Sequence, residues 1–402
     1  MRIDVGEALD DGRSVGLSRY GSAIEYVPLE SVPQSLLREG SRIFYDKGKF
    51  FIVSHFLSGA DDVPFFDESG KYLGSVGKAG RGPGEYNQLW GFTLEDDKEV
   101  TNVCIAGQQK GVVYDLSGQY ISEISFEHVK EQTGAGFIFN GGYLTYLGDG
   151  RYCLLARSNK DEALDEYFFV LDSSGNIIKQ FNVGKAIKMT ANFKRRGGAP
   201  MRAVSIYGSS IYGFYGNIRQ ISRLKDTLFA VDCENGSRRV NAVFAMYGKP
   251  FGEVSVQNEN FGLSSVLECD KFLLQKVNFP TADFPDIYNC NKVVPHTASA
   301  WLLYDKAKRS CTALKYNKVP VGAETSAVGV YAQFPGNDGF LNDLDGGMPF
   351  LPSYIKGGKM YQLVDASVFI EMAGICSSAR MKEVAAQLTE ESNPVVVVVT
   401  IK

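Results

Sequence analysis

Glycine recurs between Gly74 and Gly84, in a string that ends Gly-Pro-Gly-Glu-Tyr and is followed closely by a tryptophan. The side chains here that could contact a ligand are those of Arg81, Glu85, Tyr86 and Trp90. A glycine-rich loop cradles phosphate when it follows a strand, opens a helix and ends in Lys-Ser/Thr, or when an acidic residue follows about 20 positions on. No helix start follows this string, which argues against a nucleotide site. Two interpretations remain: a compact structural loop in which Glu85 caps backbone amides, and a ligand-facing loop.

A second candidate is the basic segment from Lys185 to Arg202, which contains no acidic residue and includes Arg195 and Arg196. A local cluster of one charge sign can steer an acidic ligand. The segment is therefore either a solvated basic loop or an anion-binding rim, with Arg195 and Arg196 as the candidate binding residues.

Metal and catalytic motifs are weak in this sequence. The acidic stretch from Asp338 to Gly347 hints at a calcium loop, but aligning Asp343, Asp345 and Gly346 with that motif puts Leu341 at the first ligand position. We therefore predict a tight Asp/Gly turn there, although calcium bound by separate loops is not excluded. The three histidines are isolated, and neither G-x-S-x-G nor H-E-x-x-H occurs. We predict no catalytic residue, no metal ligand and no cofactor.

Composition narrows the class of protein. The formal net charge of −4 argues against a general nucleic-acid binder, which would carry a basic excess. No apolar run of about 18 residues predicts a transmembrane helix, and the first residues lack the apolar region of a signal peptide. The seven cysteines show no C-x-x-C spacing and are best interpreted as small buried side chains, with a Cys290–Cys311 disulfide as the minority interpretation.

The elements that must position these residues are predicted to be strands. Aromatic residues make up 12% of the chain, which favours pleated surfaces. An apolar run, an Asp, a Gly and a return strand recur as a hairpin, because Asp can bond its own backbone two residues on and Gly supplies a positive φ. The anchors of these hairpins are Asp46, Asp67, Asp115, Asp172, Asp232 and Asp305, of which Asp232 and Asp305 are looser copies and Asp305 has no glycine after it.

About four strands per repeat are typical of the blades of a β-propeller. We predict an all-β fold, one six-bladed β-propeller domain of four-stranded antiparallel blades over residues 1–402. Residues 378–388 are rich in helix formers and predict a short C-terminal helix. The β-branched run at 393–401 then predicts a buried closing strand that joins a blade begun by the N-terminal segment.

Four segments resemble a known family, the six-bladed β-propeller proteins of Bacteroidetes, which are related in shape to NHL-repeat propellers. They are residues 24–30, 77–86, 342–352 and the terminal Ser392-Asn-Pro-Val-Val-Val, so the resemblance covers essentially the whole chain. It implies an exported protein, commonly a lipoprotein with an acylated N-terminal cysteine, in the periplasm or at the outer-membrane surface. This sequence shows neither the signal nor that cysteine, and the family supplies no catalytic residues.

The function we expect is an exported or surface-attached binding or scaffolding protein, with a glycan, a peptide or a protein as its partner and no nucleic acid. The alternative is a propeller hydrolase or lyase that acts on a saccharide or lactone, with carboxylates or calcium at the central channel. The sequence leaves the ligand, the disulfide state, the oligomeric state and the native N-terminus open.

Overall fold

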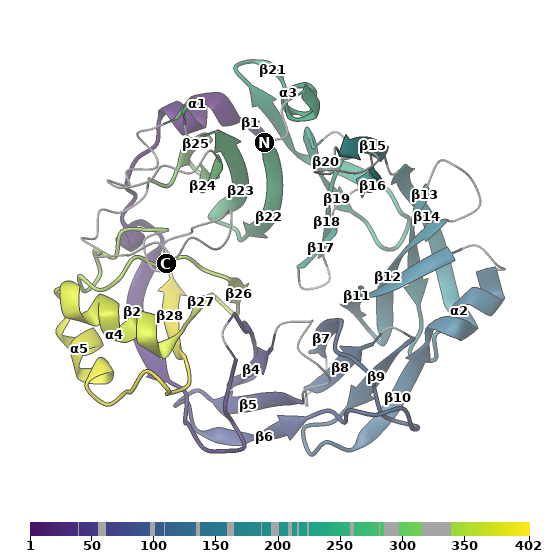
Figure 1. Ribbon diagram of the computed structural model, residues 1–402, viewed down its shortest axis with the longest axis horizontal. Helices are drawn as coiled ribbons and strands as arrows, with labels where there is room; N and C mark the ends of the chain where they lie inside the picture. Colours follow the sequence, from purple (N-terminus) through teal and green to yellow (C-terminus); the bar gives the residue numbers. More distant parts are fainter. Residues whose placement is uncertain are drawn as a thin grey trace. The chain divides into compact units, whose positions relative to one another are not determined.

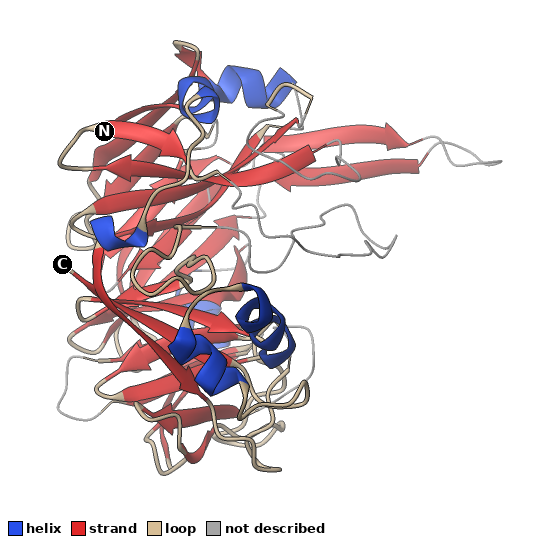
Figure 2. Ribbon diagram, turned by 90° about the vertical axis from the view of Figure 1, so that its left-hand side faces the viewer, coloured by secondary structure: helices blue, strands red, loops and turns tan. Residues whose placement is uncertain are grey.

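The computed structural model describes most of the chain (Figure 1). The described residues are 1–38, 40–54, 62–96, 101–107, 109–133, 137–158, 165–185, 187–193, 201–207, 211–214, 217–222, 225–257, 261–280, 282–284, 297–315 and 339–402. Strands dominate them, and the helices are short (Figure 2). No helix among these residues is long and apolar enough to cross a membrane.

The fold is a six-bladed β-propeller of four-stranded antiparallel sheets, as the sequence predicts. The chain divides into two compact units, one formed by Met1–His55, Val63–Ser75 and Phe244–Lys402, the other by Phe56–Asp62 and Val76–Val243. We call them the first and second unit. The single domain expected over residues 1–402 stays a prediction.

The first unit holds three of the sheets. Their strand orders are β3-β4-β5-β6, β22-β23-β24-β25 and β2-β28-β27-β26. The bounds of these strands are β2 Gly21–Pro28, β3 Arg42–Asp46, β4 Lys49–Val53, β5 Val63–Asp67, β6 Tyr72–Val76, β22 Gly262–Glu268, β23 Phe272–Pro280, β24 Thr297–Asp305, β25 Ser310–Ala313, β26 Tyr354–Lys356, β27 Lys359–Val364 and β28 Val395–Ile401.

The second unit holds the sheets β10-β9-β8-β7 and β11-β12-β13-β14, and a sheet built on β17 to β20. The bounds here are β7 Gly91–Glu95, β8 Asn102–Ala106, β9 Lys110–Tyr114, β10 Tyr120–Ser125, β11 Phe137–Gly148, β12 Arg151–Ser158, β13 Asp165–Leu171, β14 Ile177–Lys185, β15 Ile187–Phe193, β16 Met201–Tyr207, β17 Ile211–Phe214, β18 Asn217–Ile221, β19 Thr227–Val231 and β20 Arg238–Met246. The boundary between the units falls within β20, whose sheet also includes β1 Arg2–Asp4 and β21 Lys249–Pro250.

The predicted closing strand is confirmed. β28 pairs with β2 on one side and with β27 on the other, so strands from both ends of the chain share one sheet. The five valines of β28 are buried, which explains why this run shows no alternation of apolar and polar residues. Pro28 ends β2, the outer strand of the sheet, where a missing N–H donor costs no ladder bond.

Three of the predicted hairpin anchors share one turn geometry, and the turn at Asp232 is one residue longer. The side-chain oxygen Oδ1 of Asp67, Asp115 and Asp172 accepts the N–H groups two and four residues on, at 2.8–3.0 Å. Asp232 also accepts the N–H two residues on, at 2.7 Å, and Gly236 provides the left-handed residue, with φ +70°. The pKa of Asp67 lies below its ordinary value, mainly because Ser69 donates to its carboxylate.

The other two anchors work differently. The turn after Asp46 closes the β3–β4 hairpin with positive φ at both Lys47 and Gly48, and the Asp46 carboxylate meets Lys356 Nζ at 2.8 Å. The Asp305 carboxylate accepts the backbone N–H of Lys308 at 2.8 Å.

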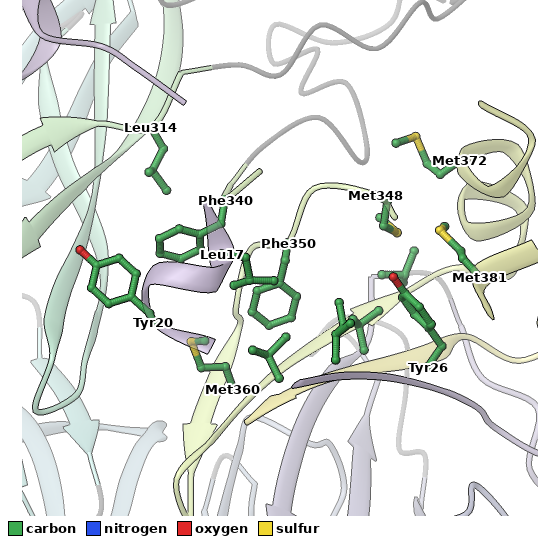
Figure 3. Close-up of a cluster of buried hydrophobic side chains, with 14 of the residues drawn as sticks. Leu17, Tyr20, Tyr26, Leu314, Phe340, Met348, Phe350, Met360, Met372 and Met381 are labelled. Carbon is green, nitrogen blue, oxygen red and sulfur yellow. The ribbon is translucent and has the colours of Figure 1, made fainter. Parts of the chain in front are cut away.

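Five α-helices occur among the described residues: α1 Val5–Asp10, α2 Phe126–Thr133, α3 Phe251–Gln257, α4 Ala366–Ile375 and α5 Ala379–Ala385. The predicted C-terminal helix is present as α5, capped by the Ser378 hydroxyl, which accepts the N–H of Met381 at 3.1 Å. The preceding α4 was missed. Its side chains enter the main core of the first unit, where Met348, Met372 and Met381 gather beside Tyr26 (Figure 3).

Candidate functional site

The glycine-rich segment folds as a loop within the second unit. We call residues 77–90 the glycine loop; it leads into β7 and contacts the sheet that β7 begins. Alternate residues of a strand share one face, and two such residues of β9 reach the loop. The Tyr114 hydroxyl donates to the carbonyl of Gly84 at 2.7 Å, and Lys110 Nζ donates to the carbonyl of Gly82 at 3.4 Å. The loop therefore covers one face of this sheet.

Two glycines allow this close fit. Gly77 has φ +113°, and a Cβ there would lie 2.6 Å from the Tyr86 hydroxyl oxygen and 2.7 Å from Ile105 Cδ1. Gly84 has φ +67°, and a Cβ there would lie 2.9 Å from the ring of Tyr120. Only glycine takes such backbone angles freely and fits such gaps. Close packing thus explains the glycines at positions 77 and 84.

Glu85 holds the loop together from within. Its Oε2 accepts the backbone N–H of Gly82 at 2.9 Å, and its Oε1 meets Lys78 Nζ at 2.8 Å. The hydrogen bond from Lys78, followed by that from Gly82, lowers the pKa of this carboxyl. This is the capping role that the structural interpretation of the loop expects.

The remaining candidate side chains of the loop are exposed to different degrees. Tyr86 is 1% exposed, and its backbone exchanges hydrogen bonds with Lys78 and Gly80, so its ring faces the protein. Trp90 is half-buried, with its indole N–H donating to Gln88 Oε1 at 2.9 Å. Arg81 is exposed. No ion pair of its guanidinium group occurs within the described part of the chain.

Tyr120, which sequence reasoning missed, joins this surface. It begins β10, and its ring packs beside Gly84 while the residue stays 44% exposed. No local motif marks Tyr120, because its contact with the loop is long-range. The only sequence signal was a tyrosine at the start of a return strand. The glycine loop and Tyr120 together present a cation and an aromatic ring.

Only part of the basic segment from Lys185 to Arg202 lies among the described residues. Arg195 and Arg196, the candidate binding residues, lie outside them. The segment from Ile187 to Phe193 is not a loop but the strand β15, which pairs with β16. Its alternation of apolar and polar residues, Ile-Lys-Met-Thr, is the signal that the interpretation as a loop overlooked.

The acidic stretch near residue 343 forms a hydrogen-bonded turn in the first unit. Asp343 accepts both the backbone N–H and the hydroxyl of Ser18, at 2.7 and 2.6 Å. Asp345 accepts four donors, from Tyr26, Asn342, Gly347 and Ser378. Donors thus occupy the oxygens that a calcium ion would need. Within the described ranges no group of three or more His, Cys, Asp or Glu side chains could hold a metal.

A second carboxylate network, which is buried, centres on Asp305. Its Oδ2 accepts the guanidinium of Arg19 and, at 2.8 Å, the hydroxyl of Tyr20. Burial alone would raise the pKa of Asp305, but the hydrogen bonds from Lys308 N–H, Tyr20 and Arg19 outweigh it, so the pKa lies below its ordinary value. Asp305 thereby ties the residues before β2 to the β24–β25 hairpin, which is a structural role.

The cysteines in the described ranges are Cys104, Cys153, Cys233, Cys269, Cys311 and Cys376, and all are free thiols. Cys104 and Cys153 are buried, as expected, whereas the other four are half-buried. Cys290, the other half of the minority disulfide interpretation, lies outside the described residues.

Comparison with solved structures supports the fold. A candidate exported protein from Bacteroides fragilis aligns with a TM-score of 0.62 over 100% of this chain and 99% of its own, at 15% identity. A member of the DUF4221 family from Bacteroides vulgatus aligns with a TM-score of 0.46 over 95% of this chain and 97% of its own, at 13% identity. The likeness to the Bacteroides fragilis protein, at 15% identity, concerns the fold alone.

Sequence comparison assigns the chain to a protein family. No protein with a curated description matches it. One family matches residues 1–400, which is nearly the full length. The chain therefore belongs to the family described as a domain of unknown function, DUF4934.

Proposed function

We propose that this protein is an exported binding module that holds an acidic saccharide on the surface formed by the glycine loop and Tyr120. The observations that carry the proposal are an exposed arginine, Arg81, in a loop fixed by its own hydrogen bonds, and a partly exposed tyrosine ring, Tyr120, that packs against the same loop at Gly84. A binding surface held in shape before the ligand arrives loses little entropy on binding.

Arg81 supplies the charge recognition. A guanidinium group presents a planar fork of N–H donors that matches a carboxylate in two parallel hydrogen bonds. Glu85, the nearest carboxylate in the loop, is already bound to Lys78 and to the Gly82 amide. Arg81 is thus left to face an external anion.

Tyr120 supplies an aromatic surface. Its ring is seated against Gly84, so it is ordered by packing while 44% of the residue stays exposed. An aromatic ring with an apolar face and a hydroxyl group is a common contact for ligands that stay partly exposed to solvent. A sugar ring that carries a carboxylate fits both contacts, whereas an acidic peptide would satisfy the arginine alone.

Export and attachment to a surface belong to this proposal. The Bacteroides fragilis protein of the same fold is described as a candidate exported protein. We propose the periplasm or the outer-membrane surface as the location of this chain, with a lipid anchor in the precursor. Detection of the native protein in outer-membrane fractions, and its loss from them when the lipid-modification pathway is inhibited, tests this part.

The binding experiment uses a glycan array that includes uronic acid and sialic acid saccharides beside their neutral counterparts. We expect the intact chain to bind acidic saccharides, Arg81→Ala to lose at least tenfold in affinity, and Tyr120→Ala to weaken binding of saccharides. Arg380→Ala, which removes an exposed arginine in the first unit, is the matched control and should bind normally. Binding of acidic peptides alone, or unchanged binding by Arg81→Ala, would refute the saccharide proposal.

A further inference from the structure

Two thiols, one buried and one half-buried, lie where the β19–β20 turn of the second unit meets the sheet β11-β12-β13-β14. Cys153 is the third residue of β12 and is 2% exposed. Cys233 is the second residue of the turn that Asp232 caps and is half-buried. Both pack in one apolar cluster, whose other members include Phe168, Phe181 and Val231.

Contacts on either side fix this meeting of the two segments. Arg151 pairs with Glu234, and Lys179 Nζ approaches the same carboxylate at 3.3 Å. Further along the turn, Gly236 sits so close to Phe181 that a Cβ there would overlap the ring. The turn is therefore held against β12 and β14 at several points.

The positions of the thiols follow from these contacts. Arg151 and Cys153 are two apart on a strand, so both side chains leave the same face of the sheet. Glu234 follows Cys233 directly in the turn. The two cysteines thus lie in the apolar cluster beside the Arg151–Glu234 ion pair, and each is within two residues of one of its partners along the chain. Cys104, the third described cysteine of the second unit, packs in a different cluster.

We propose that Cys153 and Cys233 are a redox pair that closes an internal disulfide between β12 and the β19–β20 turn, with a small-molecule or protein disulfide as the oxidant. This inference goes beyond ligand binding and does not depend on it. Cys233, the more accessible thiol, reacts first: its thiolate attacks the oxidant disulfide and expels one thiolate. Cys153 then attacks the Cys233 sulfur and expels the second. Two protein thiols are oxidised and one external disulfide is reduced to two thiols.

The environment makes this reaction selective and slow. Burial raises the pKa of Cys233 to about 11, and burial, followed by the charge of Cys233, raises that of Cys153 well above its ordinary value. The thiolate is the nucleophile, so both cysteines stay largely unreactive at neutral pH. A disulfide needs Cα atoms about 4.4–6.8 Å apart, and the contacts of Glu234 and Gly236 keep the turn close to β12 and β14.

The test is a peptide map of the full chain after incubation with oxidised glutathione at mildly alkaline pH. We expect a linked pair of peptides that contain Cys153 and Cys233, and no such link after reduction. Cys153→Ser should instead stop at a glutathione adduct on Cys233, whereas Cys104→Ser, the matched control, should form the link normally.

Two results would overturn the inference. The first is a glutathione adduct that persists on Cys233 in the unsubstituted chain without the internal link. The second is a link from Cys233 to a cysteine other than Cys153. If Cys153→Ser does not fold, the map of the unsubstituted chain alone decides between these results and the expected one.

Discussion

Alanine at Gly77 should destabilise the protein far more than alanine at Gly82, although both glycines belong to the same loop. At Gly77 the new Cβ meets Tyr86 Oη at 2.6 Å and Ile105 Cδ1 at 2.7 Å, and the backbone has φ +113°. An L-residue held at such an angle costs about 1–3 kcal/mol, and overpacking a tight site costs about 1–3 kcal/mol more. The lower entropy of the unfolded alanine chain returns about 0.4–1 kcal/mol. We therefore expect a net loss of about 3 kcal/mol.

Gly82 provides the internal control. Its φ does not lie in the left-handed region, and the nearest atom to a new Cβ is Glu85 Oε2 at 3.1 Å, which needs to give way by only a few tenths of an ångström. We expect Gly82→Ala to stay within about 1 kcal/mol of the unsubstituted protein. Urea unfolding, monitored by far-UV circular dichroism and by tryptophan fluorescence, measures the free energy of unfolding of both variants. Equal free energies of unfolding for the two variants would refute the view that close packing requires these glycines.

Three further changes probe other contacts. Tyr114→Phe removes the buried hydrogen bond to the glycine loop and leaves a carbonyl without its donor, so urea unfolding should show a loss of about 1–2 kcal/mol; no loss would contradict the role of this bond. Asp305 has a lowered pKa in the folded state, so its contribution is present above the unfolded pKa of about 3.9 and is lost as pH falls through the folded value. Thermal midpoints between pH 5 and 2 should therefore fall less steeply for Asp305→Asn, and parallel curves would contradict this assignment. Donors already occupy Asp343 and Asp345, so calcium should leave the thermal midpoint unchanged, and an increase that Asp345→Asn abolishes would show a calcium site there.

The sequence predicts the fold well because its signals are local. Each hairpin turn at Asp67, Asp115 and Asp172 is specified within five residues, by an aspartate that caps the turn and a glycine with positive φ. The strand at 395–401 is likewise visible as an unbroken β-branched run. Such elements need no tertiary contact to be recognised.

The helix α4 and the strand β15 were missed for opposite reasons. α4 carries apolar side chains over most of its length, so no amphipathic pattern separates it from a buried strand. β15 carries lysines that drew attention to charge, although its apolar residues alternate as they do in a strand. In both segments one conspicuous property, hydrophobicity in α4 and positive charge in β15, obscured the sequence pattern that determines the structure.

The candidate site was only partly predictable. Arg81, Glu85 and Tyr86 share one motif, yet the structure exposes the first, uses the second as a cap and buries the third. Burial depends on which strand face the loop covers, and that is decided by residues of β8 to β10. Tyr120 enters for the same reason, through a contact with Gly84 that sequence spacing does not reveal.

The binding surface is tested most directly by titration calorimetry of Arg81→Ala and Arg380→Ala, with the acidic saccharide that binds best on the array as the ligand. We expect Arg81→Ala to lose at least tenfold in affinity while its free energy of unfolding stays within about 0.5 kcal/mol of the unsubstituted protein, because Arg81 is a surface residue. Arg380→Ala should bind as the unsubstituted protein does. Equal affinity for Arg81→Ala and Arg380→Ala would contradict the claim that the glycine loop displays the binding surface.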